Sequence, residues 1–294
     1  DASCDWSSDV CSSDLAAFGV MPILAKIAYK GGANATTVLF LRFFLAALII
    51  LPYIIVTKKE FKLNKSQLIH IAFLSVIGYT GTSFALFLSY NYITVGVATI
   101  LHFVYPVIVT AFSVILYKEK LHSSKILALT LSVIGIYLLV DSGGASLNFK
   151  GVWLALISGF FYAYYIVGVA HSEVNKIDTF VLTFYLAFIA ALSIFIIGMI
   201  NGQLDFNIKP YSFLASGSIA LVSTVLALTM FLKGIKIIGP SSAAILSTLE
   251  PIVSIILGVI ILSEKVSFTI VIGCILIVLS VIILTLGQRA RNSM

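Results

Sequence analysis

The chain has 294 residues, of which 60% are hydrophobic and only 10% are charged. About 25% of the residues of an average soluble domain are charged, so this composition excludes an ordinary water-soluble protein. The formal net charge of +6 comes from basic residues dispersed over short connecting segments. This dispersion indicates a membrane-topology signal and argues against a nucleic-acid partner.

The first fourteen residues, DASCDWSSDVCSSD, differ in composition from everything after them. They hold four of the twelve acidic residues and two of the three cysteines. We interpret residues 1–14 as a non-native or artefactual segment, because the alternative, a secretory signal, would begin with basic residues. The apolar run at 15–29 is shorter than the about 20 residues that span a bilayer, so we expect a truncated first helix.

Ten apolar segments follow one another along the chain, separated by short stretches that hold most of the lysines. Their continuous hydrophobic character indicates helices, because a membrane β-barrel would alternate polar and apolar residues. The predicted fold is therefore an all-α polytopic membrane protein of about ten transmembrane helices. The segments are 15–29, 38–56, 68–88, 95–117, 126–140, 152–170, 180–200, 211–232, 243–262 and 266–286.

The lysines and arginines predict the orientation of these helices, because cytoplasmic connections carry the excess of basic residues. With the N-terminus inside, the inner connections hold 12 of the 18 basic residues, the outer ones hold 5, and Arg42 lies within the membrane. Both termini are therefore predicted to be cytoplasmic. The inner residues are Lys58, Lys59, Lys62, Lys65, Lys118, Lys120, Lys125, Lys176, Lys233, Lys236, Arg289 and Arg291, and the outer ones are Lys26, Lys30, Lys150, Lys209 and Lys265.

An internal repeat relates the fourth and ninth segments. ATILHFVYPVIVTAFSVILYKEKL at 98–121 aligns without gaps on AAILSTLEPIVSIILGVIILSEKV at 243–266, an offset of 145 residues that takes Pro106 to Pro251. The second copy comes five spans after the first, and an odd number of crossings reverses its direction. The sequence thus predicts two inverted five-helix repeats, at 15–141 and 150–287, with a cytoplasmic tail at 288–294.

A proline followed thirteen residues later by a glutamate, in the fourth and ninth of ten spans, resembles the EamA-like family of the drug/metabolite transporter superfamily. Arg42 followed by Phe43 in the second span, and Gly135 and Gly273 in the fifth and tenth, add to the resemblance. It covers everything after residue 15. A tryptophan-glycine pair typical of the family's first helix is missing from this chain.

The resemblance implies a carrier that moves a small organic metabolite by alternating access, often outward, across the cytoplasmic membrane of a bacterium. It implies a small-molecule substrate, lipid as surroundings, no cofactor, and a monomer or homodimer. The repeat indicates the place of the site independently, because inverted-repeat transporters bind substrate near the bilayer midplane beside helix breaks. Pro106 and Pro251 predict such breaks, since proline has no N–H and leaves a carbonyl without a partner.

Glu250 is the candidate for proton coupling. It lies near the middle of the ninth span, where an ionised carboxylate costs about 3 kcal/mol or more unless it is paired, hydrated or protonated, so we expect it to face a cavity. The alternative is a protonated glutamate that only hydrogen-bonds a neighbouring helix. His102 and Tyr105 align with Ser247 and Glu250 at the repeat offset, and each pair shares a helix face. His102 is either a substrate or proton ligand or a packed histidine.

Arg42, Tyr79, Tyr162 and Tyr165 are further candidates. Arg42 is placed to meet a substrate carboxylate from the outer end of a cavity, and the alternative is that it snorkels to the membrane interface. The three tyrosines would give the cavity an aromatic lining. The alternative for them is packing or an interfacial belt.

Glu119 and its repeat partner Glu264 have a structural interpretation. Each follows one helix and precedes the next, where unpaired N–H groups stabilise a carboxylate. We interpret both as turn-forming residues.

The sequence offers little for an enzyme. It has no HExxH motif and no paired aspartates, and its four histidines lie on separate elements. Cys4, Cys11 and Cys274 lack the spacing of a disulfide framework or a metal site. We therefore expect neither enzyme activity nor a bound metal, and we keep an intramembrane enzyme or a lipid flippase as the alternative functions. A channel would need a polar ring along a pore, and the internal inversion argues for a carrier instead.

Overall fold

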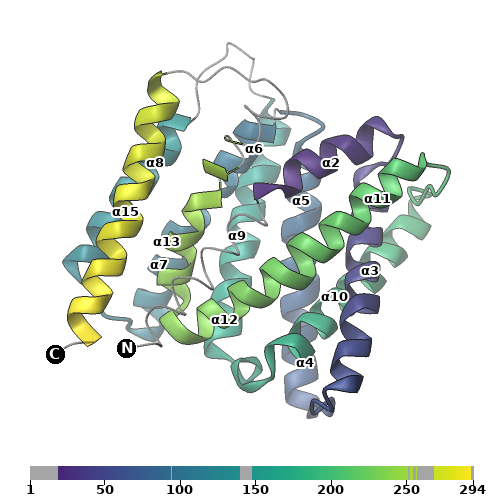
Figure 1. The fold of residues 1–294 in the computed structure, drawn as a ribbon, viewed down its shortest axis with the longest axis horizontal. Helices are drawn as coiled ribbons and strands as arrows, with labels where there is room; N and C mark the ends of the chain where they lie inside the picture. The colour runs from purple at the N-terminus through teal and green to yellow at the C-terminus, as the bar shows by residue number, and fades with distance from the viewer. Residues whose placement is uncertain are drawn as a thin grey trace.

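The computed structural model describes residues 19–93, 95–139, 148–250, 252–253, 256 and 268–292. These residues form helices and short connections, without a β-strand among them, which confirms the predicted all-α class (Figure 1). Five described segments are long and apolar enough to cross a membrane. They are Ala35–Val56, Lys65–Ser89, Phe149–His171, Thr179–Ile200 and Pro210–Ile238.

The first half contains the helices up to residue 139. The span Lys65–Ser89 is α-helical at both ends and π-helical in its middle. The elements are α2 (Met21–Lys30), α3 (Ala35–Val56), α4 (Lys65–Phe73), the π-helix η1 (Leu74–Thr80), α5 (Gly81–Ser89), α6 (Val95–His102), α7 (Tyr105–Tyr117) and α8 (Ser123–Leu139).

The second half repeats this order from residue 149. Its third helix also has a π-helical middle. The elements are α9 (Phe149–His171), the 3₁₀ turn η2 (Glu173–Lys176), α10 (Thr179–Ile200), α11 (Pro210–Ile219), the π-helix η3 (Ala220–Leu228), α12 (Thr229–Ile238), α13 (Pro240–Leu246), the 3₁₀ turn η4 (Ser247–Leu249) and α15 (Phe268–Asn292).

Matching helices of the two halves begin 144 or 145 residues apart. The starting positions pair as 35 with 179, 65 with 210, 95 with 240 and 123 with 268. The helices α3 and α10 also share their capping chemistry, because the side chains of Asn34 and Asp178 accept hydrogen bonds from backbone N–H groups of the first turn. The repeat found in two segments of the sequence thus extends over the whole helical order.

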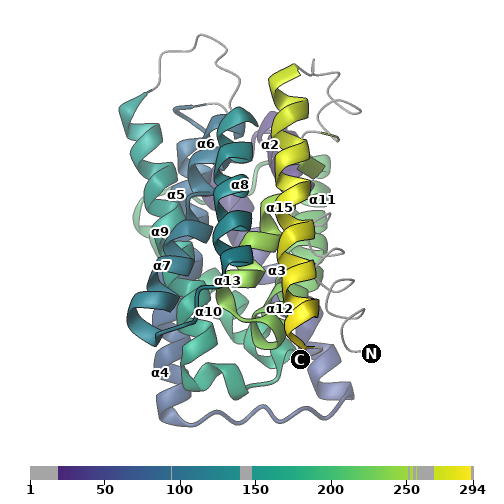
Figure 2. The same cartoon turned by 90° about the vertical axis from the view of Figure 1, so that its left-hand side faces the viewer.

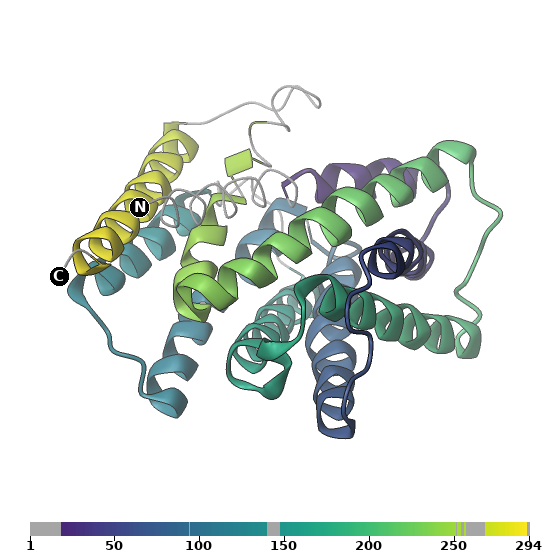
Figure 3. The same cartoon turned by 60° about the horizontal axis from the view of Figure 1, so that its bottom comes forward.

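Helices of the same rank in each half pack against each other. α3 packs on α10, and α8 packs on α15. Figure 1 shows α8 and α15 at the left edge of the molecule, and Figure 2 shows them side by side on the face that is turned toward the viewer. Figure 3 shows the molecule with its bottom brought forward. Large apolar side chains on the outside, such as Val56, Ile200 and Phe268, are exposed, as expected for a surface solvated by lipid.

The predicted fourth span, 95–117, is two helices and not one. α6 ends at His102 and α7 begins at Tyr105, because Pro106 has no N–H to give to the carbonyl of His102 four residues earlier. In the second half α13 gives way to η4 at Ser247, the position that aligns with His102. Pro251 and Glu264 lie outside the described residues, and α15 continues to Asn292, past the predicted end of the tenth span.

The close contact between α8 and α15 depends on Gly135. A Cβ on Gly135 would lie 2.7 Å from Ile277 Cγ1 and 2.9 Å from the carbonyl oxygen of Gly273. We expect Gly135→Ala to lower the unfolding free energy by about 1–3 kcal/mol, the usual cost of overpacking, as a lower apparent Tm in detergent.

Gly217→Ala is the matched control. A Cβ there would meet only Leu45 Cδ1 at 3.8 Å, so alanine should be neutral or stabilising by about 0.5–1 kcal/mol through helix propensity. Equal Tm values for the two variants would contradict the close α8–α15 contact.

Candidate functional site

A cavity of about 70 Å³ lies among the helices of the bundle. A water molecule needs about 10–15 Å³ on this measure, so the cavity has room for several waters. Its wall is formed by residues of α2, α3, η1, α5 and α6 in the first half, and by α9 and Glu250 in the second half. The sequence-predicted residues that line it are Arg42, Tyr79, His102, Tyr162 and Glu250.

Arg42 is buried, with 2% of its surface exposed. The alternative that it snorkels to the interface is therefore wrong, because its guanidinium points into the bundle. Nε donates to Thr224 Oγ1 at 2.9 Å, Nη2 donates to the Tyr79 hydroxyl at 3.2 Å, and Nη1 lies 3.1 Å from the sulfur of Met21. The guanidinium has five N–H donors, so three bonds leave two donors without a described partner.

The two halves hold Arg42 from equivalent positions. Tyr79 belongs to η1 and Thr224 belongs to η3, and the two residues are 145 positions apart, the offset of the repeat. π-Helical turns are often found at functional sites. Here each π-helix supplies one hydrogen bond to the same buried cation.

His102 ends α6 at the helix break and is buried. Its Nδ1 lies 2.9 Å from Ser158 Oγ, and that hydroxyl donates its own proton to the carbonyl of Ala155 at 2.6 Å. Ser158 Oγ must therefore accept from Nδ1–H, which leaves Nε2 of the neutral ring as a hydrogen-bond acceptor. Gly159 permits this arrangement, because a Cβ there would lie 2.7 Å from the His102 carbonyl oxygen.

Glu250 follows the η4 turn and lines the same cavity as Arg42. The ion pairs of the described residues are Lys59–Asp178 and Lys125–Glu119, so no salt bridge joins Glu250 to Arg42. A fixed cation and a carboxylate thus share one small cavity without neutralising each other directly.

Comparison with known proteins identifies the family. The sequence profile of the EamA-like transporter family matches residues 14–141 and 149–286. The chain belongs to the EamA-like transporter family. Membership of this family supports a membrane transporter.

Curated relatives of this EamA-like protein are described as uncharacterized transporters. One from Clostridium kluyveri is 21% identical over 91% of this chain and 89% of its own length. The uncharacterized inner membrane transporter YicL of Salmonella typhimurium is 26% identical over 78% of this chain and 76% of its own. A solved crystal structure aligns with a TM-score of 0.78 over 96% of this chain and 98% of its own, at 19% identity, which supports the fold.

Three predicted residues of this EamA-like transporter lie behind the cavity wall. The Tyr105 hydroxyl hydrogen-bonds Ser247 Oγ and thereby joins the two halves. The Tyr105 ring also packs on Tyr162, with centroids 4.7 Å apart, and Tyr165 packs between Tyr79 and Tyr162. Tyr105, Ser247 and Tyr165 therefore support the lining residues and do not themselves line the cavity.

Sequence reasoning missed the contribution of α5. Thr82, Ser83, Leu86, Phe87 and Tyr90 all line the cavity. Their spacing of three or four residues places them on one helical face, and the polar members of that face are the signal that could have identified them. Ser158 was also missed, because a single serine in an apolar helix carries no pattern.

Glu119 has the structural contacts expected of a turn residue. It forms an ion pair with Lys125 and accepts a hydrogen bond from Ser241 Oγ at 2.6 Å. Partial burial disfavours the charged carboxylate, but the bonds from Lys125 and Ser241 outweigh burial and hold the pKa of Glu119 below its ordinary value. The residue thus ties the end of α7 to the starts of α8 and α13.

Proposed function

We propose that this protein is a secondary carrier that exports a small organic solute bearing a carboxylate, by alternating access across the cytoplasmic membrane, and that Glu250 couples transport to protons. The observation that carries the proposal is the cavity shared by Arg42 and Glu250 without a salt bridge between them. The outward direction is the one that the family resemblance implies.

Arg42 is the reason that we propose a solute with a carboxylate group. Arginine stays protonated in proteins and its planar fork suits carboxylates, and a charge inside the membrane is costly without a partner. Two N–H groups of Arg42 lack a described partner, so a solute carboxylate would both complete its hydrogen bonds and neutralise it. The rings of Tyr79 and Tyr162 on the same wall would contact the apolar part of the solute.

Glu250 and His102 supply a route for the proton. Glu250 in its ionised form would balance the charge of Arg42 when the cavity is empty. Protonation of Glu250 would release Arg42 for the solute carboxylate, so a proton and a solute molecule would bind together and cross in the same direction. Export would then be driven by a high cytoplasmic concentration of the solute. His102, whose Nε2 is an acceptor, would pass the proton or accept a hydrogen bond from the solute.

We also propose that the two halves are inverted and that the protein has ten spans. Each half contributes helices in the same order, and the last helices of the two halves support the inversion. In Figure 1, α8 begins at the bottom, where it follows α7, whereas α15 ends at the bottom. Inverted halves allow inward and outward states to be related by exchange of their conformations around one site.

Replacement of Glu250 tests the coupling. Glu250→Gln keeps the size of the side chain but cannot exchange a proton, so we expect solute counterflow to persist in proteoliposomes while accumulation driven by a pH gradient falls to background. The solute would first be found by a thermal-shift screen of amino acids and other carboxylates. Glu173→Gln, which changes an exposed carboxylate of η2, is the control and should behave as wild type.

Two results would contradict the proposal separately. Unchanged pH-driven uptake in Glu250→Gln would remove the proton-coupling role. Unchanged transport of carboxylate solutes in Arg42→Gln would remove the carboxylate assignment, because that variant has no charge to bind them.

The orientation of the chain is tested by surface labelling. The loops with twelve basic residues predict that Lys62 is cytoplasmic and Lys209 is external. In intact cells an impermeant maleimide should label Lys209→Cys and leave Lys62→Cys unlabelled, after the native cysteines are changed to serine. The reverse pattern would refute cytoplasmic termini.

A further inference from the structure

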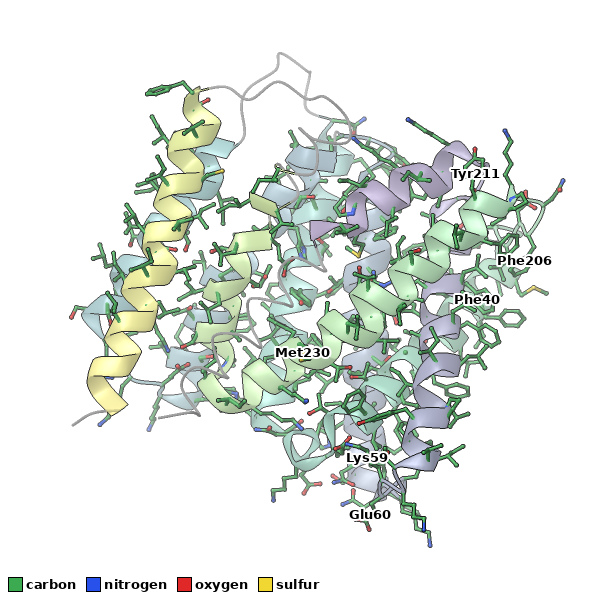
Figure 4. All side chains as sticks on the ribbon, viewed as in Figure 1. Phe40, Lys59, Glu60, Phe206, Tyr211 and Met230 are labelled. Carbon is green, nitrogen blue, oxygen red and sulfur yellow. The ribbon has the colours of Figure 1, made fainter. Side chains whose placement is uncertain are left out.

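A groove of about 370 Å³ lies on the outer surface at the end of α3. Figure 4 shows Lys59 and Glu60 at this lower end of the molecule, opposite to Phe206 and Tyr211. We propose that the groove binds one anionic phospholipid, with its phosphate between Lys58 and Lys59 and an acyl chain over the apolar floor. The groove is lined by Leu51, Ile54, Ile55, Lys58, Lys59 and Phe61. This site is separate from the central cavity and does not depend on the proposed transport function.

The backbone at Lys58 is the first reason. α3 ends in a Schellman motif, in which Lys59 N–H bonds the carbonyl of Ile54 and Lys58 N–H bonds that of Ile55, both at 3.2 Å. Lys58 sits at the left-handed position of this motif with φ of +50°. Glycine is the residue that usually occupies this position, because a Cβ is strained there.

The other half of the protein shows that the fold does not need a lysine at this position. α10 ends in the same motif, with Gly202 at φ of +60° and Gln203 N–H bonded to the carbonyl of Gly198. Gly202 and Gln203 lie 144 residues after Lys58 and Lys59, the offset between α3 and α10. The first half thus carries two lysines, one of them strained, where the second half has glycine and glutamine. A strained residue held at a surface position indicates a use for its side chain.

The charge around the groove is the second reason. The segment 57–65, TKKEFKLNK, has four lysines and one glutamate. Lys59 pairs with Asp178 at 2.5 Å and lies 4.9 Å from the centroid of the Phe180 ring, and Lys233 lies 5.5 Å from the same centroid. Lys58 is exposed and forms no ion pair with a described residue. The groove mouth therefore has a surplus of positive charge.

The surroundings select a lipid as the occupant. Leu51, Ile54 and Ile55 belong to the last turns of an apolar span, so they lie at the depth of lipid acyl chains, and the lysines after them lie at headgroup depth. Basic pockets at membrane-spanning helices on the cytoplasmic side bind anionic headgroups. A phosphate joined to an acyl chain matches both parts of the groove, whereas free phosphate matches only the lysines.

Native mass spectrometry of the purified protein tests the site. The protein is taken from nanodiscs that contain equal amounts of phosphatidylglycerol and phosphatidylcholine, and the lipids that stay bound are counted. We expect wild type to retain phosphatidylglycerol in preference. Lys58→Gly, a backbone-compatible variant that copies the residue at Gly202, should lower that retention about fivefold. Lys209→Ala removes a lysine at the opposite end and should leave it unchanged.

Ile55→Gln separates a lipid site from an anion site, because Ile55 is 65% exposed on the groove floor. This variant should also lose phosphatidylglycerol, and apparent Tm in phosphatidylcholine nanodiscs checks that each variant is folded. Equal retention of phosphatidylglycerol by folded wild type and Lys58→Gly would overturn the proposal. So would a thermal stabilisation by inorganic phosphate that equals the one given by phosphatidylglycerol.

Discussion

The burial of Arg42 inside a protein that is solvated by lipid is the constraint on which the rest of the structure depends. A guanidinium cannot lose its charge and cannot stay in an apolar core without hydrogen-bond acceptors. The fold meets this need with Thr224 and Tyr79, which carry no charge and accept one bond each. Because neither partner is a carboxylate, the positive charge remains available inside the cavity. A carboxylate at Glu250 on the same wall then makes the cavity bipolar and small.

The repeat explains how both halves of the protein hydrogen-bond the single residue Arg42. Tyr79 and Thr224 occupy equivalent places in the π-helical middles of the third helices, so Arg42 lies where the two halves meet. The Tyr105–Ser247 hydrogen bond joins α7 of the first half to η4 of the second half. The two halves differ at residues that line the cavity. Arg42 has no counterpart in the second half, and Glu250 aligns with Tyr105 in the first, so a symmetric frame holds an asymmetric site.

Much of this could be predicted from the sequence, for physical reasons that are particular to each element. Apolar runs predicted the helices because lipid leaves the backbone no other solution, and Pro106 predicted the break because it removes one donor. Five of the candidate residues line one cavity. Other features needed the structure. The π-helices have no sequence signature, and the burial of Arg42 depends on partners 37 and 182 residues away.

The central claim is that the cavity of Arg42 and Glu250 is a transport site reached from both faces of the membrane. Ser83 lines this cavity and is 6% exposed, so a cysteine there reports access. In a chain with Cys4, Cys11 and Cys274 changed to serine, Ser83→Cys would be exposed to an impermeant thiol reagent from one side of oriented proteoliposomes at a time. The account predicts modification from each side. Modification from one side alone, in protein that still transports, would contradict it.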